Sequence, residues 1–216
     1  IAVLATNTWL AWQACNALKT EWQTSEHASY NSDDYQQALL DNAAKPGEVI
    51  RKLGNFEQAT ADAARVVDAS YYAPHLAQAP MEPPAATAVV TDDSAEIWAC
   101  VQSPQTARQQ VAGALKLPLE NVTINVTLLG GGFGRKAKPD FAVEAALLAR
   151  QAGRPVKVVW RREDDIKHGY FHSVSGQRLT ATLDENNHVT GWDHKTVFPP
   201  ISSTFNPAAN KPSDGE

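Results

Sequence analysis

The chain has 216 residues, of which 43% are hydrophobic and 20% are charged, and its formal net charge is -5 at pH 7. This composition suits a globular, soluble chain of one or two domains with a sizeable core. The scattered lysines and arginines argue against nucleic-acid binding, and no run approaches the roughly 20 apolar residues that span a bilayer.

The first third of the chain predicts helices separated by irregular segments. Residues 1–22 predict a short strand and then a helix with Asn7 or Thr8 as its N-cap. A second capped helix is expected from Ser32 to about Ala44, ended by Pro46 and Gly47, with a short extended piece over residues 48–55. The chain starts without Met inside what resembles the end of a strand, so we expect a fragment of a longer protein.

The remaining elements alternate between the periods of strands and helices. Apolar residues at every second position of Asn121–Leu129 predict a half-buried strand, and the helix after it should end at Gly153. A turn at Asp184–Asn187 joins two alternating strands. The full order is a strand at 63–73, a hairpin of 87–91 with 94–102, a helix at 104–117, a strand at 121–129, a helix at 139–151, a strand at 154–162, and two strands within 175–198.

This order of elements indicates an α+β fold, with strand-helix-strand units beside antiparallel hairpins. We expect residues 1–54 to be the end of a small N-terminal α/β domain or a linker, and residues 55–200 to form the first part of the main domain. Residues 201–216 are rich in Ser, Pro and Asn and are expected to be a poorly ordered tail. Cys15 and Cys100 lack metal-binding spacing and are interpreted as small buried apolar groups.

The glycine run at Gly130–Gly134, between a strand and a helix, is the strongest local signal. Such a turn brings several main-chain N–H groups toward one point, which suits an anion. The Walker A spacing fails at Arg135 and Ala137, and the dinucleotide fingerprint is met only in its looser form ending at Ala137. A turn that merely joins strand to helix is the alternative. Phe133, a large aromatic residue within the turn, weighs against that alternative because something must cover it.

Several motifs in a fixed order resemble the molybdenum-binding subunit of the xanthine dehydrogenase and aldehyde oxidase family. They are most similar to the large (beta) subunit of isoquinoline 1-oxidoreductase-like enzymes. The motifs are "APMEPPAATAVV", "EIWACVQSPQTARQQVA", "LLGGGFGRKAKPDFAVEAALLARQAGRPVKVVWRREDD" and "HVTGWDHKTVF". The resemblance implies a molybdopterin-binding domain that holds molybdopterin cytosine dinucleotide with molybdenum. It weakens before Asn55 and after Pro200.

The resemblance also implies roles for individual residues. By position, Gln102 lies near an oxo ligand of molybdenum, and the main-chain step from Phe133 to Gly134 faces the same metal centre. The glycines would let the backbone approach the pterin dinucleotide. The cofactor-binding residues implied in this way are Gln102, Gly130, Gly131, Gly132, Phe133, Gly134 and Arg135. Without the resemblance, Gln102 is a strand-end amide that caps the next helix or bonds a neighbouring carbonyl.

The chain also departs from the family pattern. Xanthine-type members have a substrate-contacting Glu where this chain has Ala137, so a purine substrate is not expected. Isoquinoline-like members usually have a His where Gln78 stands. The family's catalytic carboxylate lies beyond this sequence, and Glu82, Glu144 and Glu163 do not match it. We therefore expect no catalytic residue here and no activity from the fragment alone.

For the parent protein, the resemblance implies a molybdenum-dependent oxidoreductase that oxidises an aldehyde or an N-heteroaromatic compound with oxygen from water. Electrons would leave through an iron-sulfur small subunit, because no Fe–S cysteine pattern exists here. The remainder of the large subunit would be a further partner. The compartment stays open between bacterial cytoplasm and periplasm. The alternative is a non-catalytic α+β module that binds at most an anion at the glycine turn.

Two other clusters have features of functional sites. His168 and His172 have the spacing of a helical metal pair but lack the neighbouring Glu of a zinc motif. The charged run Arg161–Asp165 is interpreted as a solvated, self-paired surface rather than an acid/base cluster. A third, purely structural interpretation of the turn predicts that Phe133 is buried against its own helix.

Overall fold

The computed structural model describes residues 1–206, 208, 209 and 211, and these residues form two compact units. The first unit comprises Ile1–Trp22 and Ala77–Phe171, and the second comprises Gln23–Leu76 and His172–Glu216. Both units combine helices with a sheet, which confirms the α+β prediction. Among the residues that the structure describes, no helix combines the length and the apolar character that crossing a bilayer requires.

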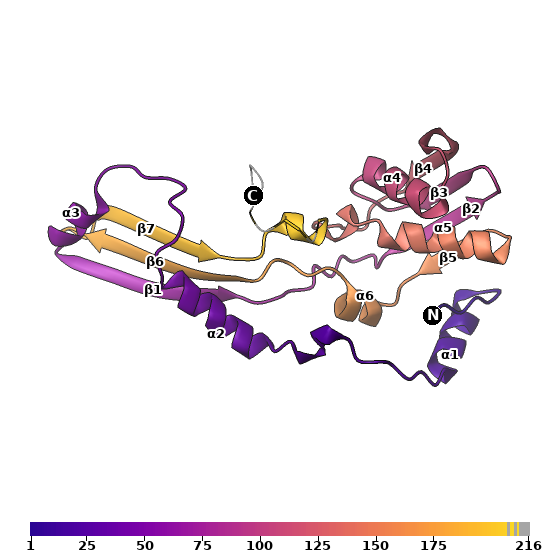
Figure 1. Cartoon of the computed structure of the whole chain (residues 1–216), viewed down its shortest axis with the longest axis horizontal. Helices are drawn as coiled ribbons and strands as arrows, with labels where there is room; N and C mark the ends of the chain where they lie inside the picture. Colours follow the sequence, from indigo (N-terminus) through magenta and orange to yellow (C-terminus); the bar gives the residue numbers. More distant parts are fainter. Residues whose placement is uncertain (207, 210, 212–216) are drawn as a thin grey trace. The chain divides into compact units, whose positions relative to one another are not determined.

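The first unit is built on a four-stranded sheet of order β4-β3-β2-β5. Strands β3 and β4 are parallel, and the other neighbours are antiparallel. Helices α4 and α5 pack against each other and against the sheet (Figure 1). The elements are α1 (Thr8–Ala17), β2 (Ala85–Val90), β3 (Ala95–Ala99), α4 (Pro104–Leu115), β4 (Val122–Val126), α5 (Asp140–Ala152), β5 (Val156–Val159) and α6 (Arg162–His168), with short 3-10 turns η2 (Leu119–Asn121) and η3 (Arg135–Ala137).

Small side chains bring α5 close to this sheet. The buried face of α5 consists largely of alanines, and it meets alanines and Ile97 of the sheet. Small facing residues let a helix and a sheet approach closely at full packing density. The helix ends at Gly153, whose φ of 62° gives the left-handed cap expected there. This packing fixes the N-terminus of α5, and therefore the position of the glycine turn before it.

The second unit is a three-stranded antiparallel sheet of order β1-β6-β7, with α2 packed against it. A Cβ atom at Gly176 would lie 2.8 Å from the main-chain carbon of Leu39, so only glycine lets α2 pack there. The elements are η1 (Glu26–Ser29), α2 (Ser32–Ala43), α3 (Phe56–Ala61), β1 (Arg65–Ala73), β6 (Ser175–Leu183), β7 (Val189–Val197) and η4 (Ile201–Thr204).

Most predicted elements are confirmed, but the strand expected near the start of the chain is not formed by the described residues, and α3 and α6 were not predicted. Asn7 caps α1 by accepting from the N–H of Leu10. The strand predicted before α1 is wrong, because those residues form no ladder with any described strand, whereas the extended piece at 48–55 stays a prediction. Cys100 is buried as expected, whereas Cys15 is half-buried.

The predicted domain boundaries at residues 54 and 200 differ from the limits of these units, because β1 pairs with β6, which follows more than a hundred residues later in the chain. As domains of the parent protein they stay predictions. Of the expected tail, Ile201–Thr204 forms η4, and residues 207, 210 and 212–216 lie outside the described residues.

Candidate functional site

The glycine turn follows β4 and ends in η3, directly before α5. Its backbone is left-handed at three positions: Gly131 has a φ of 93°, Gly134 has 90°, and Phe133, which is not a glycine, has 51°. A left-handed conformation costs a residue with a side chain roughly 1–2 kcal/mol. The Phe133 side chain is 69% exposed, so the interpretation that buries it against its own helix is wrong.

Gln102, in the loop between β3 and α4, holds the turn through hydrogen bonds. Its side-chain Oε1 accepts hydrogen bonds from the N–H of Gly134 at 3.0 Å and from the N–H of Lys136 at 3.2 Å. Its own N–H donates to the carbonyl of Lys136 at 2.9 Å. A Cβ atom at Gly132 would lie 2.4 Å from the same Oε1, so Gly132 is required for this contact. Gln102 therefore bonds the turn and does not cap α4, whose N-cap is Ser103.

The orientation of the Gln102 amide follows from these bonds. Because Oε1 receives two N–H donors, Nε2 is left as the group that points away from them. Nε2 donates to no described residue. A donor at this position suits an oxygen ligand beside the turn.

Three consecutive main-chain donors of the turn are also without partners. The N–H groups of Gly131, Gly132 and Phe133 donate to no described residue. Gly132 is buried, and an unpaired N–H in such a position costs free energy that an acceptor would offset. The N–H of Gly134 is already taken by Gln102. The turn thus offers a row of donors that suits the oxygens of an anion.

Glu82, in the loop before β2, contacts both ends of the turn. Its Oε2 accepts from the N–H of Gly130 at 3.1 Å and from Nζ of Lys136 at 2.7 Å. Partial burial by itself would raise the pKa of Glu82, but the hydrogen bonds from Lys136 and Gly130 outweigh it and hold the pKa below its usual value. Glu82 is therefore an ionised partner of a fully buried ammonium group.

The guanidinium of Arg135 points into the unit and anchors the end of the turn. It is 1% exposed and forms a bidentate ion pair with Asp140, at 2.8 and 3.0 Å. Its Nε lies 3.6 Å from a carboxylate oxygen of Asp165, and the group stacks over Trp160 and Tyr170. The predicted cofactor-binding role of Arg135 stays a prediction, and the geometry assigns its side chain to holding the turn.

The prediction of a solvated surface at Arg161–Asp165 is wrong for Asp165. Residues from Arg162 onward form α6, and Asp165 is only 3% exposed. It pairs with Arg162 at 2.9 Å and with the buried Arg135. Sequence spacing alone gave no sign of this, because the partner Arg135 lies some thirty residues away. No group of three or more metal-ligating side chains occurs among residues that the structure describes.

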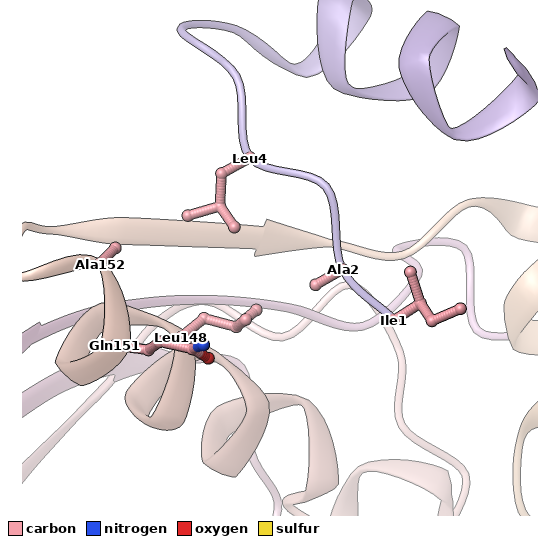
Figure 2. A pocket seen from close by; sticks show the side chains of 6 residues that line it. All are labelled: Ile1, Ala2, Leu4, Leu148, Gln151 and Ala152. Atoms are coloured by element: carbon pink, nitrogen blue, oxygen red, sulfur yellow. The ribbon is translucent and has the colours of Figure 1, made fainter. Parts of the chain in front are cut away.

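A cavity of the first unit lies away from the turn. It has a volume of about 420 Å³, and Figure 2 shows Leu148 and Gln151 of α5 facing the N-terminal segment across it. Its lining residues are Ile1, Ala2, Leu4, Leu148, Gln151 and Ala152. None of them has a titratable side chain.

The fold and the site together define an α+β domain whose glycine turn presents unpaired N–H donors suited to an anionic cofactor. Residues 41–199 match the family model described as molybdopterin cofactor-binding domain. The chain therefore belongs to this family, which binds the molybdenum cofactor. The resemblance to the molybdenum-binding subunits of the xanthine dehydrogenase and aldehyde oxidase family is confirmed.

Three known proteins illustrate the similarity. The chain is 32% identical over 201 residues to a protein of Gluconacetobacter polyoxogenes named membrane-bound aldehyde dehydrogenase [pyrroloquinoline-quinone], covering 91% of this chain and 26% of that protein. It is 40% identical over 111 residues to isoquinoline 1-oxidoreductase subunit beta of Brevundimonas diminuta, covering 51% of this chain and 14% of that subunit. The aldehyde oxidoreductase of Desulfovibrio gigas has the same fold, with a TM-score of 0.61 and 19% identity over 70% of this chain and 17% of its own.

The chain thus spans about a quarter or less of the length of these relatives. The name of the second relative marks it as one subunit of a larger assembly.

Proposed function

We propose that this chain is the cofactor-holding part of the large subunit of a molybdenum-dependent oxidoreductase. The parent protein would bind molybdopterin cytosine dinucleotide at the glycine turn and oxidise an aldehyde or an N-heteroaromatic compound. An iron-sulfur small subunit and the remainder of the large subunit would complete the enzyme. The names of the relatives support this substrate range, since they include an aldehyde dehydrogenase and an isoquinoline oxidoreductase.

One observation carries the proposal: Phe133 is held exposed and left-handed beside three unpaired N–H groups. Backbone strain and unpaired donors persist where the surrounding structure imposes them, and they concentrate at ligand sites. No described residue accepts hydrogen bonds from these three N–H groups. A bound anionic cofactor would satisfy the donors and cover the exposed ring.

Each residue of the turn has a defined part in this proposal. The N–H groups of Gly131, Gly132 and Phe133 would donate to oxygens of the cofactor, and Nε2 of Gln102 would donate to an oxo ligand of the metal. The Phe133 ring would exclude water from the site. The bound cofactor supplies two-electron redox chemistry with oxygen from water, and the protein supplies orientation and hydrogen bonds. The carboxylate base would come from the remainder of the large subunit.

The experiment is a cofactor analysis of the parent protein, co-expressed with its iron-sulfur subunit. Molybdenum, cytosine nucleotide and pyrroloquinoline quinone are measured for the wild type and for Gly132→Val combined with Phe133→Ala. Any side chain at Gly132 displaces Gln102, because a Cβ atom there lies 2.4 Å from Oε1. The matched control is Gly113→Ala, since a Cβ atom at Gly113 of α4 has no neighbour within 4 Å.

We expect near-stoichiometric molybdenum and cytosine nucleotide in the wild type and the control, and loss of both in the double variant with its circular dichroism unchanged. A well-folded, iron-sulfur-replete wild type without molybdenum would refute the proposal. It would leave the alternative of a non-catalytic module that binds at most an anion. Pyrroloquinoline quinone in place of molybdenum would equally refute the choice of cofactor.

A further inference from the structure

One carboxylate oxygen ties together the two ends of the glycine turn. Oε2 of Glu82 receives both the N–H of Gly130, where the turn begins, and Nζ of Lys136, where it ends. The N–H of Glu82 in turn donates to the carbonyl of Gly130 at 2.9 Å. The five residues between Gly130 and Lys136 include the row of unpaired donors. Glu82 therefore fixes the chain on both sides of that row.

Steric contacts make this arrangement specific to the residues present. A Cβ atom at Gly130 would lie 2.5 Å from Cβ of Glu82, so glycine is required for the carboxylate to reach the turn. Lys136 is fully buried, so its ammonium group has no solvent to replace a lost partner.

A second set of contacts holds the loop that carries Glu82. Nη2 of Arg162 donates to the carbonyls of Pro80 and Met81, the two residues before Glu82. Nη1 of Arg162 pairs with the buried Asp165. The loop that carries Glu82 is thus attached to α6. The ion pair between Glu82 and Lys136 in turn attaches this loop to the glycine turn.

Stability alone does not account for this pair. Lys136 loses its hydration on burial, which offsets much of what the pair contributes to stability, while the Glu82 side chain stays 39% exposed. What distinguishes the pair is that its hydrogen bonds have a defined geometry. They fix the position of the turn relative to the loop before β2. A donor row that must meet a rigid ligand needs such fixed geometry.

We infer that Glu82 and Lys136 are positioning residues of the site, and that their ion pair holds the donor row of Gly131–Phe133 in the shape that receives the cofactor. The inference rests on the proposed function for the identity of the ligand. Neither side chain touches the cofactor in this account, and both act through the main chain of the turn. The role inferred for Glu82 is therefore a positioning role and not that of the carboxylate base, which the proposed function places in the remainder of the large subunit.

The test uses Glu82→Gln and Lys136→Met in the parent protein with its iron-sulfur subunit. Lys136→Met breaks the same ion pair by removing the buried ammonium group, and it leaves no unpaired buried charge. It therefore tests the role of the ion pair even if Glu82→Gln does not fold. The matched control is Glu96→Gln on β3, whose carboxylate bonds only the side chain of Asn125 at 2.9 Å among described residues. Two readouts are taken: deuterium uptake of the peptide containing residues 134–136, and molybdenum per polypeptide.

Residues 134–136 are chosen because their N–H groups bond Gln102 and Gly132 and do not bond Glu82. We expect their exchange to be about tenfold faster in both variants and unchanged in Glu96→Gln. Molybdenum retention during dialysis should fall by about tenfold, the lower end of what loss of a supporting contact costs a metal site.

Exchange at the wild-type rate in both variants would overturn the inference, and so would faster exchange with full molybdenum retention. Absence of molybdenum from the wild type is a separate result. It refutes the proposed function, while the exchange measurement still decides whether Glu82 and Lys136 position the turn.

Discussion

Replacing Asp140 with Asn tests whether the buried Arg135 holds the glycine turn in place. Asp140 accepts two hydrogen bonds from Arg135, at 2.8 and 3.0 Å, while the guanidinium is 1% exposed. Asn keeps the shape and one acceptor but removes the charge. One charge-assisted bond, worth about 1.5–3 kcal/mol, is lost, and the other becomes neutral and loses about 1 kcal/mol. The nearby Asp165, 3.6 Å from Nε, compensates only in part.

The free energy of unfolding should therefore fall by about 3 kcal/mol, at the lower end of the cost of breaking a buried ion pair. Urea titration followed by tryptophan fluorescence measures this change, and Trp160 reports directly because Arg135 stacks 5.1 Å from its ring. The control is Asp68→Asn, which removes an exposed ion pair with Arg178 in the second unit and should lower the free energy of unfolding by less than about 1 kcal/mol. An unaltered midpoint for Asp140→Asn would refute the assignment of Arg135 as an anchor.

Three further predictions concern the turn itself. Gly132→Ala should displace Gln102 and break its two hydrogen bonds to the turn, which lowers the free energy of unfolding by about 1–3 kcal/mol in the same titration. The control Gly113→Ala should instead stabilise α4 by roughly 0.5–1 kcal/mol. Equal effects of the two substitutions would contradict the contact between Gly132 and Gln102. Phe133→Gly should stabilise the cofactor-free chain by about 1 kcal/mol, because glycine adopts a φ of 51° without strain. The same variant should bind less cofactor, because it lacks the ring. A less stable variant would show that the backbone at Phe133 is not strained. The pKa of Glu82 is lower in the folded state, so its contribution to stability is present above the unfolded pKa and is lost as the pH falls through the folded pKa. The protection factor of the turn's amides, which corrects for the slower intrinsic exchange at lower pH, should fall on acidification in the wild type and stay flat over that range in Glu82→Gln; parallel profiles would contradict this.

The helices and strands were accessible from the sequence wherever local signals agreed. Asn7 and Gly153 mark helix ends by local chemistry, and alternating apolar residues mark β4, β6 and β7. The strand expected before α1 fails because a short apolar run forms a strand only if a neighbour pairs with it. Pairing partners far along the chain are invisible to local periodicity. For the same reason the sequence did not reveal that β1 joins β6 and β7 in one unit.

The candidate site divides in the same way. Glycines beside Phe133 indicated a left-handed turn facing a ligand, because residue type limits φ directly. The buried position of Asp165 was predicted wrongly, since burial of a charge depends on partners that only the folded chain supplies.

The sequence by itself determined the family, the α+β class and the place of the glycine turn, since these follow from residue order and local conformational preference. Only the tertiary structure decided what closes the turn. It brought two residues from separate segments into contact with residues 130–136. Glu82 bonds Gly130 and Lys136 at the two ends, and Gln102 bonds Gly134 between them. The physical reason is that hydrogen bonds and ion pairs depend on distances of about 3 Å in space, which separation along the chain does not encode.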